Sequence, residues 1–197
     1  MDTSKYLLQT ENKKDHIMID LEALSTLPNA LILSIGAVKF NPFDNNETEC
    51  PDGSVLLPNF YARVDVESQG DEFDISDPTM EWWAKQEEHI KDEAFNSKER
   101  VPLAEALTGL FKFCSGVDHY WANGSTFDYP ILEHAHRAVG KGFKWMFWQV
   151  KDSRTMMKMS GATAPDTWKH HALYDCFNQI VGLQRAFKEL NIKEVKK

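Results

Sequence analysis

Two carboxylates stand close together at the end of an apolar segment. In the stretch HIMIDLEAL, positions 16–24, three apolar residues lead into Asp20 and, two positions later, Glu22. In a strand, residues i and i+2 face the same side about 7 Å apart. Two unit charges at that distance repel each other by roughly 2–3 kcal/mol at an effective dielectric constant near 20. A partly buried pair therefore needs a raised pKa, a basic partner or a bound cation.

Two further aspartates lie near the starts of predicted helices. Asp128 follows a strand-like segment through a short turn, and Asp175 lies near the beginning of the last predicted helix. Aspartate is also common at helix starts for local reasons, so each residue alone permits a purely structural interpretation. In sheets of this kind, however, sites form in a crevice at the carboxyl ends of the strands. Four carboxylates meeting there would suit Mg²⁺ or Mn²⁺, and nothing in the sequence indicates zinc.

The segments that must position these acids alternate between strand and helix patterns. The short spacing of the first three predicted strands indicates an antiparallel meander, although the second connection is long and rich in turn residues. Strands are predicted at 16–22, 31–41, 59–65, 118–124 and 147–152. Helices are predicted at 79–90, where Asp77 is the expected N-cap, and at 102–115, 127–140, 153–159 and 172–190. These elements predict an α/β fold, in which a mixed sheet combines the meander with parallel strands and carries helices on both faces.

Length and composition predict one soluble intracellular domain. The 197 residues divide into an N-terminal extension (1–15), a domain (16–190) and a short tail (191–197). A net charge of −8 disfavours a protein that coats nucleic acid through phosphate contacts, but it is compatible with an enzyme that holds a few nucleotides through bound metal ions. The three scattered cysteines, Cys50, Cys114 and Cys176, indicate reduced thiols, and no signal peptide or membrane span is predicted.

Three motifs carry a resemblance to a known family. DLEA at 20–23, NGSTFDYPIL at 123–132 and HHALYD at 170–175 resemble the DEDDh branch of the DnaQ-like 3′–5′ exonucleases, which have a ribonuclease H-like fold. In that branch four residues separate a histidine from the last aspartate. His170 has this spacing to Asp175, whereas only three residues separate His171 from Asp175. The phrases LSIGAVKFNP and TMEWWAKQ resemble the small Rv2179c-like and phage exonuclease A type, and the resemblance spans roughly 16–187.

The resemblance implies a two-metal-ion phosphodiester hydrolysis. It assigns Asp20 to both ions, Glu22 and Asp175 to the first and Asp128 to the second, with Mg²⁺ or Mn²⁺ as the metal. It also makes His170 the general base that deprotonates the attacking water, which imidazole suits because it titrates near pH 6.5. The product would be a nucleoside 5′-monophosphate.

Further residues are expected to contact substrate or to support the site. The expected substrate-binding residues are Ala23, Leu24, Asn123, Phe127 and Trp83. Many relatives carry threonine at the position of Ala23. Alanine at this position is expected to modify the activity rather than to abolish it. Adjacent helical residues point about 100° apart, so one of Trp82 and Trp83 can pack in the core while the other lines a groove. Asp152 resembles a residue common in the family, but it is interpreted as the N-cap of the helix that follows it.

The expected function is a metal-dependent 3′–5′ exonuclease that acts on single-stranded 3′ ends. DNA is taken as the leading substrate, and an exoribonuclease that trims RNA 3′ overhangs is the alternative. An inactive nuclease-fold binding module is a third interpretation, which the complete acid set argues against. The expected partner is a single-stranded DNA or RNA 3′ end, with no membrane, and the expected state is a monomer or homodimer. The expected location is the cytoplasm of a bacterial cell or phage-infected host.

Overall fold

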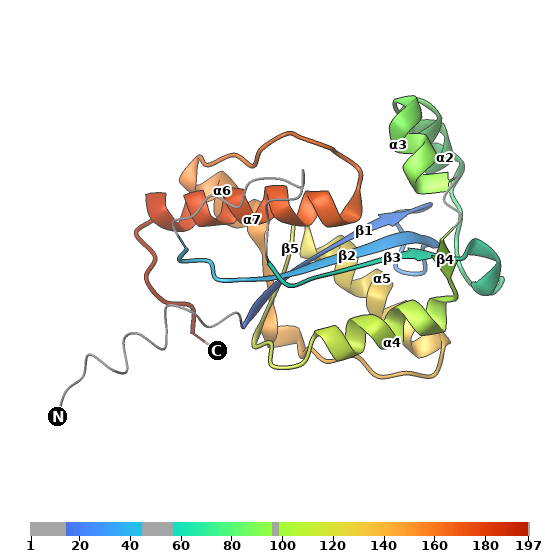
Figure 1. The fold of residues 1–197 in the computed structure, drawn as a ribbon, viewed down its shortest axis with the longest axis horizontal. Helices are drawn as coiled ribbons and strands as arrows, with labels where there is room; N and C mark the ends of the chain where they lie inside the picture. Colours follow the sequence, from blue (N-terminus) through green and yellow to red (C-terminus); the bar gives the residue numbers. More distant parts are fainter. Residues whose placement is uncertain (1–14, 45–56, 96–98, 197) are drawn as a thin grey trace.

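One mixed β-sheet runs through the part of the chain that the computed structural model describes, residues 15–44, 57–95 and 99–196 (Figure 1). Its strand order is β4-β3-β2-β1-β5-β6. The strands are β1 (His16–Ala23), β2 (Ile32–Phe40), β3 (Asn59–Val64), β4 (Arg100–Val101), β5 (His119–Ala122) and β6 (Val150–Asp152). The predicted extension apart from residue 15, most of the connection 42–58, and Cys50 lie outside the described residues.

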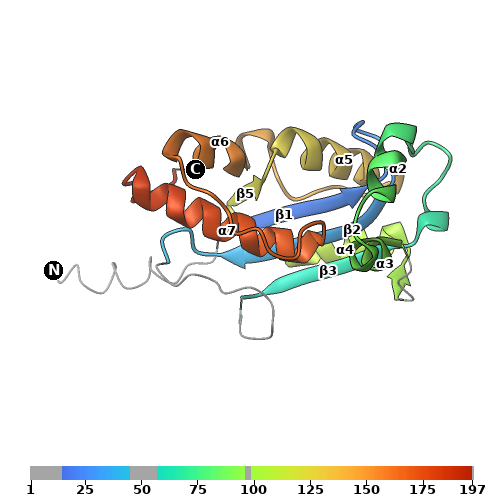
Figure 2. The same ribbon diagram turned by 90° about the horizontal axis from the view of Figure 1, so that it is seen from above.

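Helices cover both faces of this sheet, as predicted. In Figure 1, α7 and α6 lie above the sheet and α4 and α5 below it, while α2 and α3 stand near one end. Figure 2, seen from above, shows α7 lying across β1 and β2. The helices are α2 (Asp77–Ala84), α3 (Glu88–Phe95), α4 (Leu103–Phe113), α5 (Ser125–Ala138), α6 (Ser153–Ser160) and α7 (Ala172–Glu189). Among the described helices, none combines the length and the apolar character that a membrane span requires.

The predicted meander and the predicted parallel strands are both confirmed. β1 pairs antiparallel with β2, and β2 pairs antiparallel with β3. β5 pairs parallel with β1, and β6 pairs parallel with β5. The carboxyl ends of β1, β5 and β6 therefore lie at the same edge of the sheet. Asp20 and Glu22 lie near this end of β1, and α5, which carries Asp128, begins after β5 at the same edge.

Some predicted boundaries are wrong for local reasons. Ser76, not Asp77, caps α2, because its side chain accepts from the backbone N–H of Thr79 at 3.4 Å. The helix predicted at 79–90 is two helices, since α2 ends at Ala84 and α3 begins at Glu88. The strand predicted at 147–152 begins with a 3₁₀ turn, η2 (Phe147–Gln149), and only its last three residues join the sheet. The two-residue β4 was too short to give a sequence signal.

Side chains of β1 alternate between two separate cores. Ile17, Ile19 and Leu21 belong to the larger core, which includes residues of α4 and α5. Met18 belongs to a second core, which contains Cys176, Phe177 and other residues of α7. Because successive strand side chains point to opposite faces, Asp20 and Glu22 share the face of Met18. The carboxylates therefore lie on the side of the sheet that α7 covers.

Gly36 of β2 lets the first turn of α7 approach the sheet closely. Gly36 pairs with Asp20 in the register of β1 and β2. A Cβ atom at this position would lie 2.3 Å from the carbonyl carbon of Ala172, the first residue of α7. Only glycine avoids that collision, so the start of α7 can lie directly over the strand pair that carries Asp20.

Candidate active site

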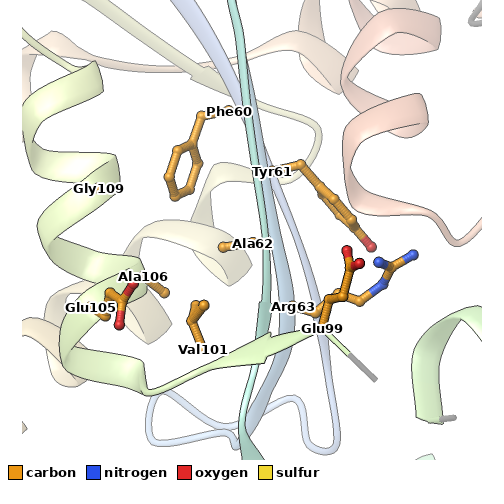
Figure 3. Close-up of a pocket in the computed structure, with 9 residues that line it drawn as sticks. All are labelled: Phe60, Tyr61, Ala62, Arg63, Glu99, Val101, Glu105, Ala106 and Gly109. Carbon is orange, nitrogen blue, oxygen red and sulfur yellow. The ribbon is translucent and has the colours of Figure 1, made fainter. Parts of the chain in front are cut away.

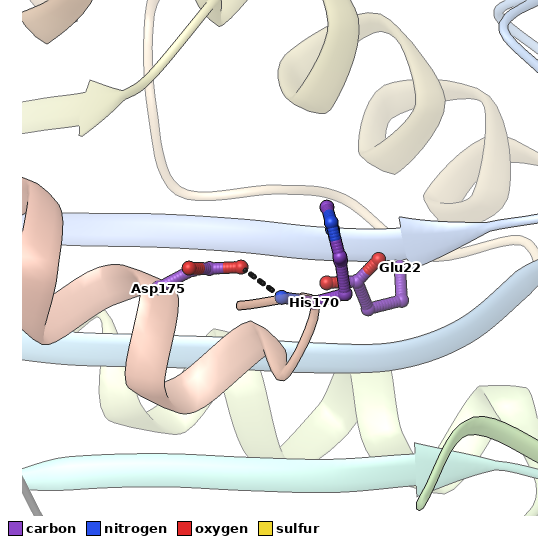
Figure 4. A group of neighbouring side chains, drawn as sticks. All are labelled: Glu22, His170 and Asp175. Carbon is purple, nitrogen blue, oxygen red and sulfur yellow. Dashed lines mark hydrogen bonds between the residues drawn. The ribbon is translucent and has the colours of Figure 1, made fainter. Parts of the chain in front are cut away.

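The fold brings the four predicted carboxylates together. Asp128, in the first turn of α5, accepts a 3.2 Å hydrogen bond from the backbone N–H of Leu21, which lies between the two acids of β1. On the other side, ligand atoms of Glu22, Asp175 and His170 all lie within 4.8 Å of one another (Figure 4). Residues more than a hundred positions apart thus converge around the end of β1.

Burial raises the pKa of every acid in this cluster, and repulsion by the neighbouring acids adds to the effect at Asp20 and Glu22. The pKa of Asp20 is raised well above its usual value by burial first, and then by the charges of Asp128, Asp175 and Glu22. Burial, followed by the neighbouring aspartates, also raises the pKa of Glu22. Burial raises the pKa of Asp128 to about 7 and that of Asp175 to about 6.

The described residues supply little compensating charge to this cluster. None of the ion pairs among them involves any of the four acids. Gln179 of α7 donates a 2.7 Å hydrogen bond from Nε2 to Asp20 Oδ1, but its own Oε1 is buried and has no hydrogen-bond partner among the described residues. An all-oxygen donor set with an unmatched negative charge and an orphaned buried oxygen fits Mg²⁺ or Mn²⁺.

His170 stands beside the carboxylates in an unusual backbone conformation. Its φ angle of 62° is in the left-handed region, which residues other than glycine seldom adopt. Its backbone N–H donates a 2.8 Å hydrogen bond to Asp175 Oδ2, drawn as the dashed line in Figure 4. Burial lowers the pKa of the imidazole, and the charge of Lys169 lowers it further. The side chain is therefore neutral near pH 7 and able to accept a proton.

His171 faces a different set of groups. Its ring stacks on Tyr174 at 4.0 Å and on Tyr61 at 4.6 Å, and its Nε2 lies 3.4 Å from Glu93 Oε1. Glu93 is held in turn by the hydroxyl of Tyr61 at 2.6 Å and by two hydrogen bonds from Arg63. The two adjacent histidines thus have different surroundings. His170 faces the acids, whereas His171 connects the start of α7 to α3 and β3.

A hollow of about 300 Å³ lies along β3 and β4, but it includes none of the four acids. Figure 3 shows Tyr61 and Arg63 on one side of β3, and Phe60 and Ala62 on the other. This alternation is that of any β-strand, and the hollow is separate from the acid cluster. The candidate site is recognised by its cluster of acids.

Comparison with known proteins identifies the family. The sequence profile of the Rv2179c-like 3′–5′ exoribonuclease domain matches residues 15–186. The chain belongs to this family. It is therefore a 3′–5′ exonuclease domain, and membership implies a nucleic-acid substrate and a requirement for divalent metal. No match was found among curated proteins.

Two solved structures share the fold of this Rv2179c-like domain. The RNase domain of the yeast Pop2 protein is 10% identical, with 94% of this chain and 82% of that chain covered and a TM-score of 0.56. The nuclease domain of 3′hExo, a DEDDh family member bound to rAMP, is 15% identical, with 90% and 94% covered and a TM-score of 0.53. These likenesses show that the predicted ribonuclease H-like fold is correct.

One predicted substrate residue of the Rv2179c-like domain lies in the wrong place for that role. Trp83 is 2% exposed, and its indole N–H donates a 3.0 Å hydrogen bond to the carbonyl of Ala23. It is a packing residue that fixes the strand end behind the acids. Trp82 is 40% exposed, and its ring lies 4.7 Å from that of His170 at 90°. Of these two adjacent tryptophans, Trp82 is therefore the exposed one.

The other predicted substrate residues flank the acids. Ala23 and Leu24 are buried just beyond Glu22. Asn123 is half-buried, and within the described part of the chain its side-chain Oδ1 has no hydrogen-bond partner. Phe127 is half-buried and packs against the larger core next to Asp128.

Asp152 does more than the predicted capping of α6. Its Oδ1 accepts from the backbone N–H of Thr155 at 2.7 Å, which confirms the N-cap. Its Oδ2 accepts from the backbone N–H groups of Gly124 and Ser125 at 2.9 and 2.8 Å. Gly124 has a φ angle of 109°, so the turn that delivers Asp128 depends on both glycine and this carboxylate.

Three residues that shape the site were not predicted from the sequence: Gly36, Glu93 and Gln179. For Gln179 a signal existed, because it follows Asp175 by four residues and so lies on the same face of the helix. No comparable signal pointed to Gly36 or Glu93, whose roles arise from contacts between distant segments.

Proposed function

We propose that this domain removes nucleoside 5′-monophosphates one at a time from the 3′ end of single-stranded nucleic acid. The observation that carries the proposal is the group formed by Glu22, Asp175 and His170, whose ligand atoms lie within 4.8 Å of one another. Two further acids, the half-buried Asp20 and the buried Asp128, lie close enough to this group to interact with it electrostatically. That arrangement combines a cation site with a neutral base, which is what phosphodiester hydrolysis by this route requires.

In this proposal the acids hold two divalent ions, Mg²⁺ or Mn²⁺. Asp20, Glu22, Asp128 and Asp175 would hold these ions through their carboxylate oxygens. Such ions, when bound, neutralise the acids and polarise the phosphate that is attacked. Gln179 orients Asp20 through the 2.7 Å hydrogen bond, a role that outer partners of metal ligands commonly have.

His170 is the proposed general base. Its neutral imidazole takes a proton from the water whose oxygen bonds to phosphorus, while the bond from phosphorus to the 3′ oxygen of the preceding nucleotide breaks. The departing 3′ oxygen gains a proton from solvent. The hydrogen bond from the backbone of His170 to Asp175 keeps the base and one metal-binding acid in a fixed relation.

RNA is the first substrate to test. The family description names an exoribonuclease, so the sequence-based preference for DNA is not carried forward. Ala23, Leu24, Asn123 and Phe127 remain proposed contacts for the terminal nucleotide, and Trp82 replaces Trp83 as the proposed aromatic contact because it is exposed beside His170.

The test uses single-stranded RNA and DNA labelled at the 5′ end. Stepwise shortening from the 3′ end in Mg²⁺ or Mn²⁺ is expected, and it should disappear with EDTA and in the Asp128→Ala variant. Binding of the oligonucleotide without shortening under either metal would contradict the proposal and favour a binding module.

A further inference from the structure

An exposed tryptophan stands two residues before His170. Trp168 lies in the segment that joins α6 to α7, and 62% of its surface is exposed. Like His170, it has a left-handed backbone, with a φ angle of 53°. Figure 1 shows this segment arching over α7 and descending to its amino end, on the side where α2 and α3 lie. A large apolar ring is thus presented to solvent on a strained backbone beside the site.

Two other rings hold the indole of Trp168 in place. The ring of Tyr174, from the first turn of α7, lies 5.8 Å away at 74°. The ring of His89, from α3, lies 6.3 Å away at 86°. Both contacts are edge-to-face rather than stacked, and the indole stays mostly exposed, so stacking surface remains for another planar group.

Trp82 and Trp168 lie on two segments that adjoin the proposed base. The ring of Trp82, on α2, contacts the ring of His170, whereas Trp168 precedes His170 by two residues in the chain and contacts rings of α3 and α7. Apart from the terminal nucleotide, the substrate of a 3′–5′ exonuclease lies entirely on the 5′ side of the scissile bond. An aromatic surface that extends the site therefore meets nucleotides on the 5′ side.

The charges near these rings favour stacking over phosphate contacts as the source of binding. Lys169 is paired with Asp166 at 2.6 Å, and Lys91 is paired with Glu88 at 2.9 Å. The whole chain carries a net charge of −8. Aromatic stacking tolerates any base and needs no positive charge, which suits a domain of this composition.

We propose that Trp168, supported by Tyr174 and His89, forms a base-stacking subsite for a nucleotide on the 5′ side of the scissile phosphodiester. This subsite rests on the proposed function, because it needs a single-stranded substrate in the acid site. It has no role in the bond-breaking step itself. Its contribution is confined to substrates that extend beyond the terminal nucleotide.

The experiment compares two substrates that differ in what lies on the 5′ side. One is a single-stranded decamer of RNA or DNA. The other is the p-nitrophenyl ester of thymidine 5′-monophosphate, which offers one nucleotide and no base beyond the scissile bond. Trp168→Ala is expected to raise KM for the decamer about tenfold, with kcat unchanged and with kcat/KM for the ester within about twofold of wild type. Trp168→Phe is expected to restore part of the loss.

Trp148 provides a matched control, because it is 61% exposed and is therefore as accessible as Trp168. It precedes β6 at the amino end of that strand, whereas the acids lie at the carboxyl ends of the parallel strands. Trp148→Ala should leave both substrates unaffected. An equal loss on both substrates in Trp168→Ala, or no loss on the decamer, would overturn the subsite while leaving the proposed function intact. A wild-type protein that hydrolyses neither substrate would reject the proposed function and the subsite together.

Discussion

The backbone N–H of His170 donates a 2.8 Å hydrogen bond to the carboxylate of Asp175, so the proposed base and one proposed metal-binding acid form a single unit. The bond spans the turn into α7 and accompanies the left-handed φ angle of His170. It directs the imidazole of His170 toward Glu22, whereas the imidazole of His171 contacts Glu93.

The two histidines can be separated by substitution. His170→Ala is expected to lower kcat by about 10²–10⁴-fold, the usual contribution of a general base, while folding and Mn²⁺ binding persist. His171→Phe is the matched control, because it keeps a ring between Tyr61 and Tyr174 and should retain most of the turnover. Steady-state rates on a single-stranded oligonucleotide check both. Near wild-type turnover in His170→Ala would remove this residue from the mechanism.

The metal-free protein should lose stability as the pH rises. Asp128 has a pKa of about 7 in the folded protein, against 3.8 for the unperturbed group, and Asp175 has a pKa of about 6. Between about pH 4 and pH 7 the folded state therefore binds more protons than the unfolded state. The stabilisation is complete below about pH 4 and disappears as the pH rises through 6 and 7.

Thermal unfolding in EDTA measures this effect. The Tm of the wild type should fall between pH 5 and pH 8 by roughly 5 °C or more, and Mg²⁺ should recover part of the loss at pH 8. Asp128→Asn, which cannot ionise, should show a smaller fall. If the Tm of the two proteins fell equally with pH, the raised pKa of Asp128 would be contradicted.

Gly36 should tolerate no side chain. Gly36→Ala places a Cβ atom against the backbone of Ala172, so the start of α7 must move and carry Asp175 away from β1. Overpacking of this kind costs about 1–3 kcal/mol, and activity should fall at least tenfold because the acids separate. Gly142→Ala is the control, since nothing lies within 4 Å of a Cβ atom there. A Gly36→Ala protein with wild-type activity and Tm would show that α7 is not fixed by this contact.

Gln179 should affect metal affinity rather than folding. Gln179→Ala removes the hydrogen bond to Asp20, a contact that favours the ionised acid, and should weaken Mn²⁺ binding about 10- to 100-fold. Gln184→Ala, on the same helix but bonded to the backbone of Asn41, should bind Mn²⁺ as the wild type does. Calorimetric titration distinguishes them, and equal affinities would refute the supporting role of Gln179.

Local periodicity predicted much of the architecture. The i, i+2 spacing of Asp20 and Glu22 predicted that both lie on one face of β1. The structure adds that α7 covers this face, which the sequence did not predict. Which of Trp82 and Trp83 is buried could not be predicted, because the choice depends on the carbonyl of Ala23, sixty residues away. The role of Gly36 was likewise hidden, since the sequence does not say which helix crosses β2. The predicted tail at 191–197 is only partly a tail, because Ile192 and Val195 pack against the second core.

Calorimetric titration of the wild-type domain with Mn²⁺, beside Asp20→Asn and Asp175→Asn, tests the central claim most directly. The acids are expected to bind two ions per chain, and each substitution should abolish or sharply weaken at least one of the two binding events. A wild-type protein that binds no Mn²⁺, or variants that bind it as the wild type does, would contradict the claim that these four carboxylates form a metal site.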